Sequence, residues 1–117
     1  MILLNKSDEE ILNALTPLAI DMENGWNENN YQKFSLNMTD DFRNQVDLEE
    51  FNKQRNEAYP KLGNHELSNL VVLHKNPDNI IIIWKMKYEK RNELGLAMYY
   101  FKELNDKIVI IGSMFHA

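Results

Sequence analysis

The stretch Ile80-Ile81-Ile82-Ile83-Trp84-Lys85-Met86-Lys87-Tyr88 decides the fold, because its side chains alternate with the two-residue period of a β-strand. The even positions are apolar from Ile80 to Tyr88, whereas the odd positions are apolar only as far as Ile83. One face of this strand therefore needs cover along its full length, and the other face needs cover along half of it. We expect a curved sheet with helices on its inner face and a second surface, such as another copy of the chain, against part of its back.

Three other stretches share this alternation: residues 64–75, 94–104 and 107–116. The connections between the four stretches are short and rich in turn residues, as in Asn76-Pro77-Asp78-Asn79 and the tight Asn105-Asp106 pair. A further turn is expected near residues 91–93. Short connections between successive strands predict an antiparallel meander in the second half of the chain.

Helical signals fill the first half. Ser7-Asp8-Glu9-Glu10 matches a capping box, in which the serine hydroxyl and the last glutamate satisfy each other's backbone N–H groups. The apolar residues that follow recur at steps of four and three and mark one stripe of a helix: Ile11, Leu15, Leu18, Met22 and Trp26. Pro17 lies inside this helix and is expected to kink or divide it near residues 14–16.

Two shorter helices are expected before the first strand. Asn29 or Asn30 can cap a short second helix, and Thr39-Asp40-Asp41-Phe42 predicts another turn or cap. A third helix begins at Asp47 and ends by Gly63. Helices followed by a meander predict an α+β fold, with three N-terminal helices packed on a curved antiparallel β-sheet.

The composition excludes several classes of protein. The chain has 117 residues, enough for the single domain expected at 1–117, and its formal charge of −5 argues against a nucleic-acid partner. It has no cysteine, and its histidines, His65, His74 and His116, lack a metal-binding spacing, so we expect no metal and no cofactor. No apolar run approaches the roughly 20 residues of a membrane span. We expect no membrane partner and a cytoplasmic location for the chain as given, with an exported mature domain as the alternative.

The order of the elements resembles the nuclear-transport-factor-2-like, or SnoaL-like, superfamily, and so do several local motifs. Gly25-Trp26-Asn27 before Tyr31-Gln32-Lys33-Phe34 resembles the superfamily's exit from its first helix, and Thr39-Asp40-Asp41-Phe42 resembles the turn that follows. Tyr100-Phe101-Lys102 with residues 107–112 resembles its closing hairpin. The resemblance implies the cystatin-like cone, a cone-shaped roll with a pocket between sheet and helices. Members include isomerases, dehydratases, hydrolases and transport adaptors, so the resemblance implies no single activity.

The pocket implied by the resemblance is expected to be apolar if the even positions of the second strand face inward. The expected lining residues are Trp26, Tyr31, Ile82, Trp84, Met86, Tyr88, Met98, Tyr100 and Met114. Such side chains suit a flat apolar ligand, but we favour the alternative that they form core against the first helix. None of them is a carboxylate. In the enzymes of the superfamily an interior Asp or Glu often serves as the base, so this expected absence argues against an enzyme.

Three residues are candidates for acid–base chemistry: Tyr88, Tyr100 and His116. They would act around an apolar substrate, as in an isomerase or a lyase. Such an enzyme would also need a carboxylate brought inward by a bulge, with Glu103 or Asp21 as the candidates. The alternative for His116 is a half-exposed imidazole near the end of the chain.

The opposite parity of the strands forms a second apolar surface on the back of the sheet. Its expected members are Ile81, Ile83, Tyr99, Phe101, Val109, Ile111 and Phe115. Monomers rarely expose apolar patches beyond a few hundred Å². A homodimer that pairs two sheets around a twofold axis would cover this surface, given roughly 800 Å² per partner.

The leading hypothesis is a non-catalytic binding module for a small apolar molecule or a protein, homodimeric through the outer sheet face. The first alternative is a small acid–base isomerase or lyase that uses tyrosine and histidine in the cone. The second is an adaptor whose apolar sheet meets an unrelated partner protein.

Overall fold

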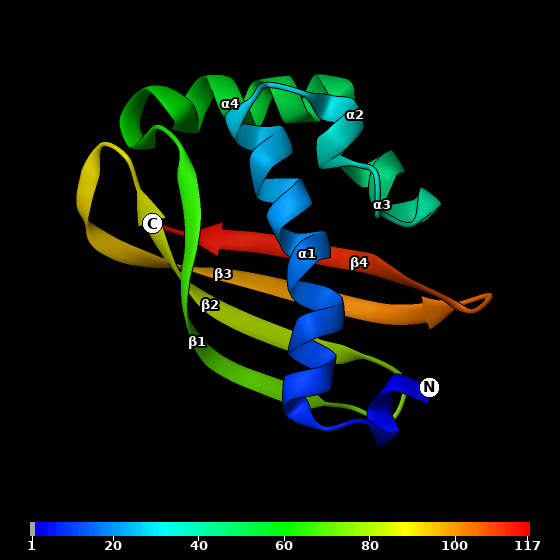
Figure 1. The fold of residues 1–117 in the computed structure, drawn as a ribbon. Helices are drawn as coiled ribbons and strands as arrows, with labels where there is room; N and C mark the ends of the chain where they lie inside the picture. Colours follow the sequence, from blue (N-terminus) through cyan, green and yellow to red (C-terminus); the bar gives the residue numbers. More distant parts are fainter. Residues whose placement is uncertain (1) are drawn as a thin grey trace.

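The computed structural model describes residues 2–117 (Figure 1). In chain order the elements are η1 (Ile2–Asn5), α1 (Asp8–Asn27), α2 (Tyr31–Phe34), α3 (Asp40–Gln45), α4 (Leu48–Leu62), β1 (His65–Lys75), β2 (Ile80–Tyr88), β3 (Arg91–Leu104) and β4 (Lys107–His116). The strands form one antiparallel sheet in the order β1-β2-β3-β4, and the helices lie over one face of it. The predicted α+β class, with helices on a curved meander, is confirmed.

The long first helix begins as the sequence predicts. The Ser7 hydroxyl accepts a hydrogen bond from the Glu10 backbone N–H, and the Glu10 carboxylate accepts one from the Ser7 backbone N–H. Pro17 does not divide α1, which is continuous from Asp8 to Asn27, so the predicted division is wrong. The wholly buried Leu15 and Ala19 on either side of Pro17 hold both parts of the helix on the core.

Another difference is an additional helix. Thr39 caps a full helix, α3, rather than an isolated turn, because its side chain accepts a hydrogen bond from the Phe42 N–H. The fourth helix runs through Pro60 to Leu62, and Gly63 follows with a φ of 73°, a left-handed conformation that favours glycine.

The parity of β2 is as predicted, but that of β3 is the reverse. The even residues of β2 are all buried. Glu89 and Lys90 form a two-residue turn that pairs Tyr88 with Arg91, and such a turn always places residues of opposite parity side by side. The inward residues of β3 are therefore the odd ones, as with Tyr99 and Phe101, which are 1% and 0% exposed.

A β-bulge in β4 changes the inward parity halfway along that strand. Phe101 pairs with Ile110, yet Tyr100 pairs with Gly112, so Ile111 is an extra residue. Ile110 faces the core before the bulge, and Ser113 lies opposite the inward Tyr99 after it. Beyond the bulge the odd residues face inward, so the expectation that Met114 and His116 point into the cone is wrong.

Helix α1 lies along β1 in the opposite direction, and polar contacts fix both of its ends. At its start, Asp8 lies 3.4 Å from Lys75 Nζ at the end of β1. At its end, the Asn27 side chain exchanges two hydrogen bonds of 2.8 Å with the backbone of His65. Helix α2 approaches closely because residue 25 is glycine: a Cβ there would lie 2.3 Å from the backbone N of Phe34. These contacts place the last turns of α1, α2 and the start of β1 around one space.

Candidate functional site

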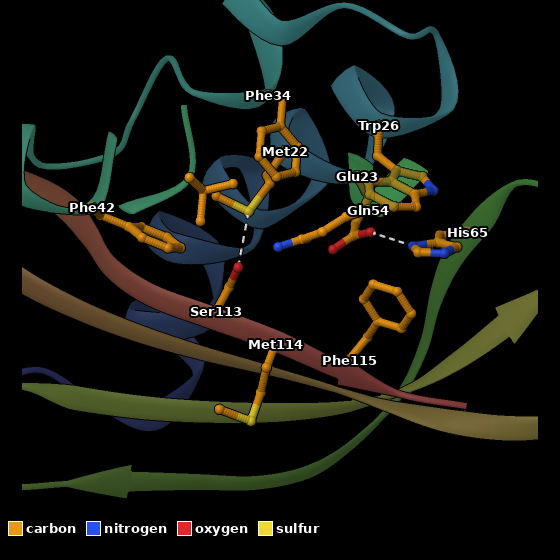
Figure 2. Close-up of a pocket in the computed structure, with 11 residues that line it drawn as sticks. Met22, Glu23, Trp26, Phe34, Phe42, Gln54, His65, Ser113, Met114 and Phe115 are labelled. Atoms are coloured by element: carbon orange, nitrogen blue, oxygen red, sulfur yellow. Dashed lines mark hydrogen bonds and ion pairs between the residues drawn. The ribbon is translucent and has the colours of Figure 1, made fainter. Parts of the chain in front are cut away.

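A cavity of about 220 Å³ lies between the C-terminal half of α1, the segment from α2 to α4 and the end of β4 (Figure 2). Most of its wall is apolar: Met22, Trp26, Phe34, Phe42, Val46, Met114 and Phe115. Four polar side chains complete the wall: Glu23, Gln54, His65 and Ser113. The bulge in β4 brings Ser113 to this wall, where its hydroxyl lies 3.2 Å from Met22 Sδ.

Glu23 is the acid in this cavity. Its side chain is 13% exposed, because Glu23 follows Met22 and precedes Trp26 on the stripe of α1 that packs on the sheet. One carboxylate oxygen lies 2.9 Å from His65 Nδ1, and the other accepts a hydrogen bond from the Tyr99 hydroxyl. The result is a mostly apolar cavity with one carboxylate, each of whose two oxygens contacts a polar side chain.

His65 is the buried imidazole that completes the pair. It begins β1, its side chain is 1% exposed, and its ring stacks on Trp26 with 5.1 Å between centroids. The edges of Tyr88 and Phe115 pack against it at 5.2 and 4.8 Å. An ionised carboxylate only accepts hydrogen bonds, so Nδ1 carries the proton in the pair; in the neutral imidazole the lone pair is then on Nε2.

Two buried side-chain nitrogens have no hydrogen-bond partner within residues 2–117: His65 Nε2 and Trp26 Nε1. Both rings belong to the wall of the cavity. Leaving a buried polar atom without a partner costs about 1–3 kcal/mol, so such atoms in a native protein call for an explanation. A ligand with a hydrogen-bonding group would provide one.

Tyr99 orients the carboxylate from the sheet. Burial raises the pKa of Tyr99 well above its ordinary value of 10.0, and the neighbouring charge of Glu23 and the hydrogen bond to it raise it further. The hydroxyl therefore stays protonated and remains a donor at neutral pH. Burial and the charge of Glu23 also raise the pKa of Tyr88, although Arg91 opposes them.

The three predicted catalytic residues do not meet. Tyr88 lies in the core beside His65, and its hydroxyl donates to the carbonyl oxygen of His116 at 3.2 Å. Tyr100 and His116 lie on the outer parity of β3 and β4. The expected carboxylate candidates are also elsewhere: Glu103 accepts a hydrogen bond from the Leu3 backbone N–H, and Asp21 is not part of the cavity wall. The side chains of Tyr100 and His116 do not join Tyr88, because the β2–β3 turn reverses the expected parity of β3 and the bulge at Ile111, which the sequence analysis did not foresee, reverses that of the end of β4.

Of the predicted lining residues, Trp26 and Met114 border this cavity. Figure 2 shows the Met114 side chain extending to the other side of the sheet, in agreement with its 50% exposure. Four are core residues of β2 on the inner face: Ile82, Trp84, Met86 and Tyr88. Tyr31 packs on Phe34 and Phe51, and its hydroxyl donates to the Val46 carbonyl. Met98 and Tyr100 were placed on the wrong face, because the odd residues of β3 are the inward ones.

Of the seven residues predicted on the outer surface, four lie on the outer face of the sheet and three do not. Ile81, Ile83, Val109 and Ile111 are half-buried on the outer parity of their strands. Three other members were predicted wrongly, since they face inward: Tyr99, Phe101 and Phe115. Leu96, Met98 and Tyr100 take their places on the outer face of β3.

The functional residues that the sequence analysis missed are Glu23, His65, Tyr99 and Ser113. Glu23 could have been found, because Ala19, Met22, Glu23 and Trp26 follow the spacing i, i+3, i+4, i+7, which puts the acid inside the apolar stripe. His65 shares the parity of Leu67, which faces the sheet's inner side. Glu23 corrects the expectation that the interior holds no carboxylate. No group of three potential metal ligands lies within residues 2–117, and no helix in that range is long and apolar enough to cross a membrane.

Comparison with known proteins yields a likeness in fold. No protein-family model matches the chain, and no curated protein matches it either. The solved structure of Bd1075 from Bdellovibrio bacteriovorus is similar, with a TM-score of 0.56 and 13% identity over 93% of this chain. The chain spans 42% of the length of that protein. At this identity the similarity concerns the fold alone.

Proposed function

We propose that this chain is a nuclear-transport-factor-2-like domain that binds a small, mainly apolar molecule in the cavity beside α1, with Glu23 and His65 as its polar anchor. The observation that carries the proposal is the buried carboxylate–imidazole pair in an apolar wall, with His65 Nε2 lacking a partner. A cavity of this kind, apolar with a few converging polar groups, is the usual form of a small-molecule site.

The polar anchor defines what the ligand must carry. His65 Nε2 accepts a hydrogen bond, whereas Trp26 Nε1 donates one. A hydroxyl group can pair with either nitrogen, because it donates through its proton and accepts through its oxygen. The apolar remainder of the molecule would pack against Phe34, Phe42 and Phe115.

The test is a fragment screen followed by NMR of the two tryptophan indole N–H signals. Trp26 borders the cavity, whereas Trp84 lies in the core and does not, so it is the internal control. We expect small apolar alcohols to shift the Trp26 signal and to leave that of Trp84 almost unchanged. Equal shifts at both, or shifts confined to other surfaces, would contradict the proposal.

A second function, proton transfer on the bound molecule, is favoured by the hydrogen bonds of Glu23. In such a reaction His65 Nε2 would take a proton from the ligand, Glu23 would stabilise the imidazolium, and Tyr99 would hold Glu23 in place. The test is exchange of ligand C–H protons next to a carbonyl in D₂O, followed by mass spectrometry. Catalysed exchange that disappears in Glu23→Gln supports an isomerase or lyase, and binding without exchange supports a binding module.

We also propose that two copies pair through the outer sheet face. In support, Val72 and Met114 on the outer parity expose 40% and 50% of their surface, and they pair with the half-buried Ile83 and Met98. Light scattering at micromolar concentration should give twice the 13.9 kDa chain mass, and Ile83→Asp should give a monomer. A monomer in the unchanged protein would contradict self-pairing and favour an adaptor with a different partner.

A further inference from the structure

A second hollow adjoins the cavity on the side of α4. This groove has a volume of about 570 Å³ and lies between α4, the start of β3 and the end of β4. Gln54 and Phe115 line both the groove and the inner cavity, so the two spaces meet at these two side chains. A molecule longer than the inner cavity could therefore continue past them.

The charged side chains differ between the two spaces. The inner cavity contains one acid, Glu23, and its wall includes no lysine or arginine. The groove has two cations, Lys61 and Arg91, against one acid, Glu57. Apart from Gln54, its remaining wall is apolar, with Ala58, Leu62 and Phe115, and Ala117 also borders it.

Arg91 is available to a ligand. Its only ion pair within residues 2–117 joins Nε to Glu93 at 3.5 Å, and the Glu93 side chain is 74% exposed. An ion pair so open to solvent is weak, of the order of 0–1 kcal/mol. The Arg91 guanidinium also lies 6.0 Å from the Tyr88 ring, the outer limit of a cation–π contact. A carboxylate or phosphate can form bidentate hydrogen bonds with such a guanidinium.

We infer that the ligand of this domain is an elongated amphipathic anion. Its apolar body occupies the inner cavity and passes Phe115, and its anionic group lies in the groove at Arg91 and Lys61. The direction follows from charge, because Glu23 repels an anion at the inner end and the two cations attract one at the outer end. This inference rests on the proposed function, since it requires a small molecule in the inner cavity.

The test compares three probes of equal length and different charge: hexanoate, hexanol and hexylamine. Each is titrated while the Trp26 indole signal and the Arg91 Nε–H signal are followed by NMR. We expect hexanoate to shift both signals together and to bind about five-fold more tightly than hexanol, with hexylamine weakest. Raising the salt concentration should remove most of the difference between hexanoate and hexanol.

Variants locate the anionic group. Arg91→Gln and Lys61→Gln should each weaken hexanoate about two- to three-fold, and the double variant should bind hexanoate no better than hexanol. None of these three variants should change the affinity for hexanol. Lys53→Gln, an exposed residue of α4 outside the groove, is the matched control and should leave all three affinities unchanged.

The outcomes separate the two proposals. If hexanol and hexanoate shift the Trp26 signal with equal affinity, the anionic class is wrong and the cavity proposal stands. Hexanoate that shifts the Arg91 signal without that of Trp26 also overturns the inference, because the two spaces would then bind separately. If no probe shifts the Trp26 signal, the proposed function fails together with the inference.

Discussion

The two halves of helix α1 lie on the same sheet but pack in different ways. Ile11 and Leu15 in the N-terminal half, and Ala19 just beyond the middle of the helix, are 0% exposed and belong to a continuous apolar core. In the C-terminal half, Met22 and Trp26 are almost as buried, yet they border a cavity that also contains the carboxylate of Glu23. The N-terminal half, called the closed half below, therefore supplies stability. The C-terminal half, called the open half, borders the candidate site. The change occurs within a single turn, between Ala19 and Glu23.

The largest expected effect tests the closed half. Leu15→Ala should lower the free energy of unfolding by about 3–4 kcal/mol, because it removes buried apolar surface and leaves a void in a packed core. Met22→Ala should cost less, about 2 kcal/mol, since the side chain already borders an open space. Urea unfolding followed by circular dichroism measures both.

Asn13→Ala serves as the control, because Asn13 is exposed on the same helix. It should change the stability by less than about 0.5 kcal/mol. Equal losses for Leu15→Ala and Met22→Ala would mean that the two halves of α1 are packed alike, and the comparison would fail.

The next effect concerns the polar group of the open half. Glu23→Leu should lower the free energy of unfolding by about 2–3 kcal/mol, because the buried His65 Nδ1 would lose its acceptor and the Tyr99 hydroxyl would keep only the Ala19 carbonyl oxygen, 3.3 Å away. Glu23→Gln should cost about 1 kcal/mol, since its amide oxygen can still accept one hydrogen bond. Urea unfolding at pH 7 measures both variants.

A double variant identifies the cause of that loss. Adding Tyr99→Phe to Glu23→Leu removes a hydroxyl whose hydrogen bond to Glu23 is already lost, so the double variant should lose less than the sum of the single losses. Strict additivity would show that Glu23 and Tyr99 are not energetically coupled, against the hydrogen bond that joins them.

The closed half could be predicted from the sequence, and the open half only in part. The stripe of α1 and the even parity of β2 follow from periodicity, which is a local property of the chain. Glu23 breaks the stripe without ending the helix, and periodicity alone treats such a residue as an exception. Its role depends on His65, which lies 42 positions away in the sequence, so only tertiary structure brings the pair together.

Register explains the rest of the errors. The inward face of β3 depends on whether the preceding turn has two residues, and that of β4 depends on one extra residue at Ile111. A shift of one residue moves every side chain to the other face. That is why Tyr99 and Phe115 were expected outside and Tyr100 and His116 inside, although the strands themselves were recognised.

The smallest expected effect at neutral pH belongs to Tyr99→Phe, and its pH dependence is the informative part. The variant should lose about 1 kcal/mol at pH 7 through the missing hydrogen bond to Glu23. Because the pKa of Tyr99 is raised in the folded protein, the unfolded chain releases this proton first as the pH rises past its ordinary value of 10.0. The corresponding stability is complete below that pH and is lost at about 1.4 kcal/mol per pH unit above it.

The Tyr99→Phe variant lacks this loss. Urea unfolding should therefore show the gap in unfolding free energy between the variant and the unchanged protein closing and then reversing at alkaline pH. A gap that stays constant would mean that the Tyr99 hydroxyl ionises as readily in the fold as in the unfolded chain, and that the open half of α1 is wetter than the burial of Glu23 and His65 implies.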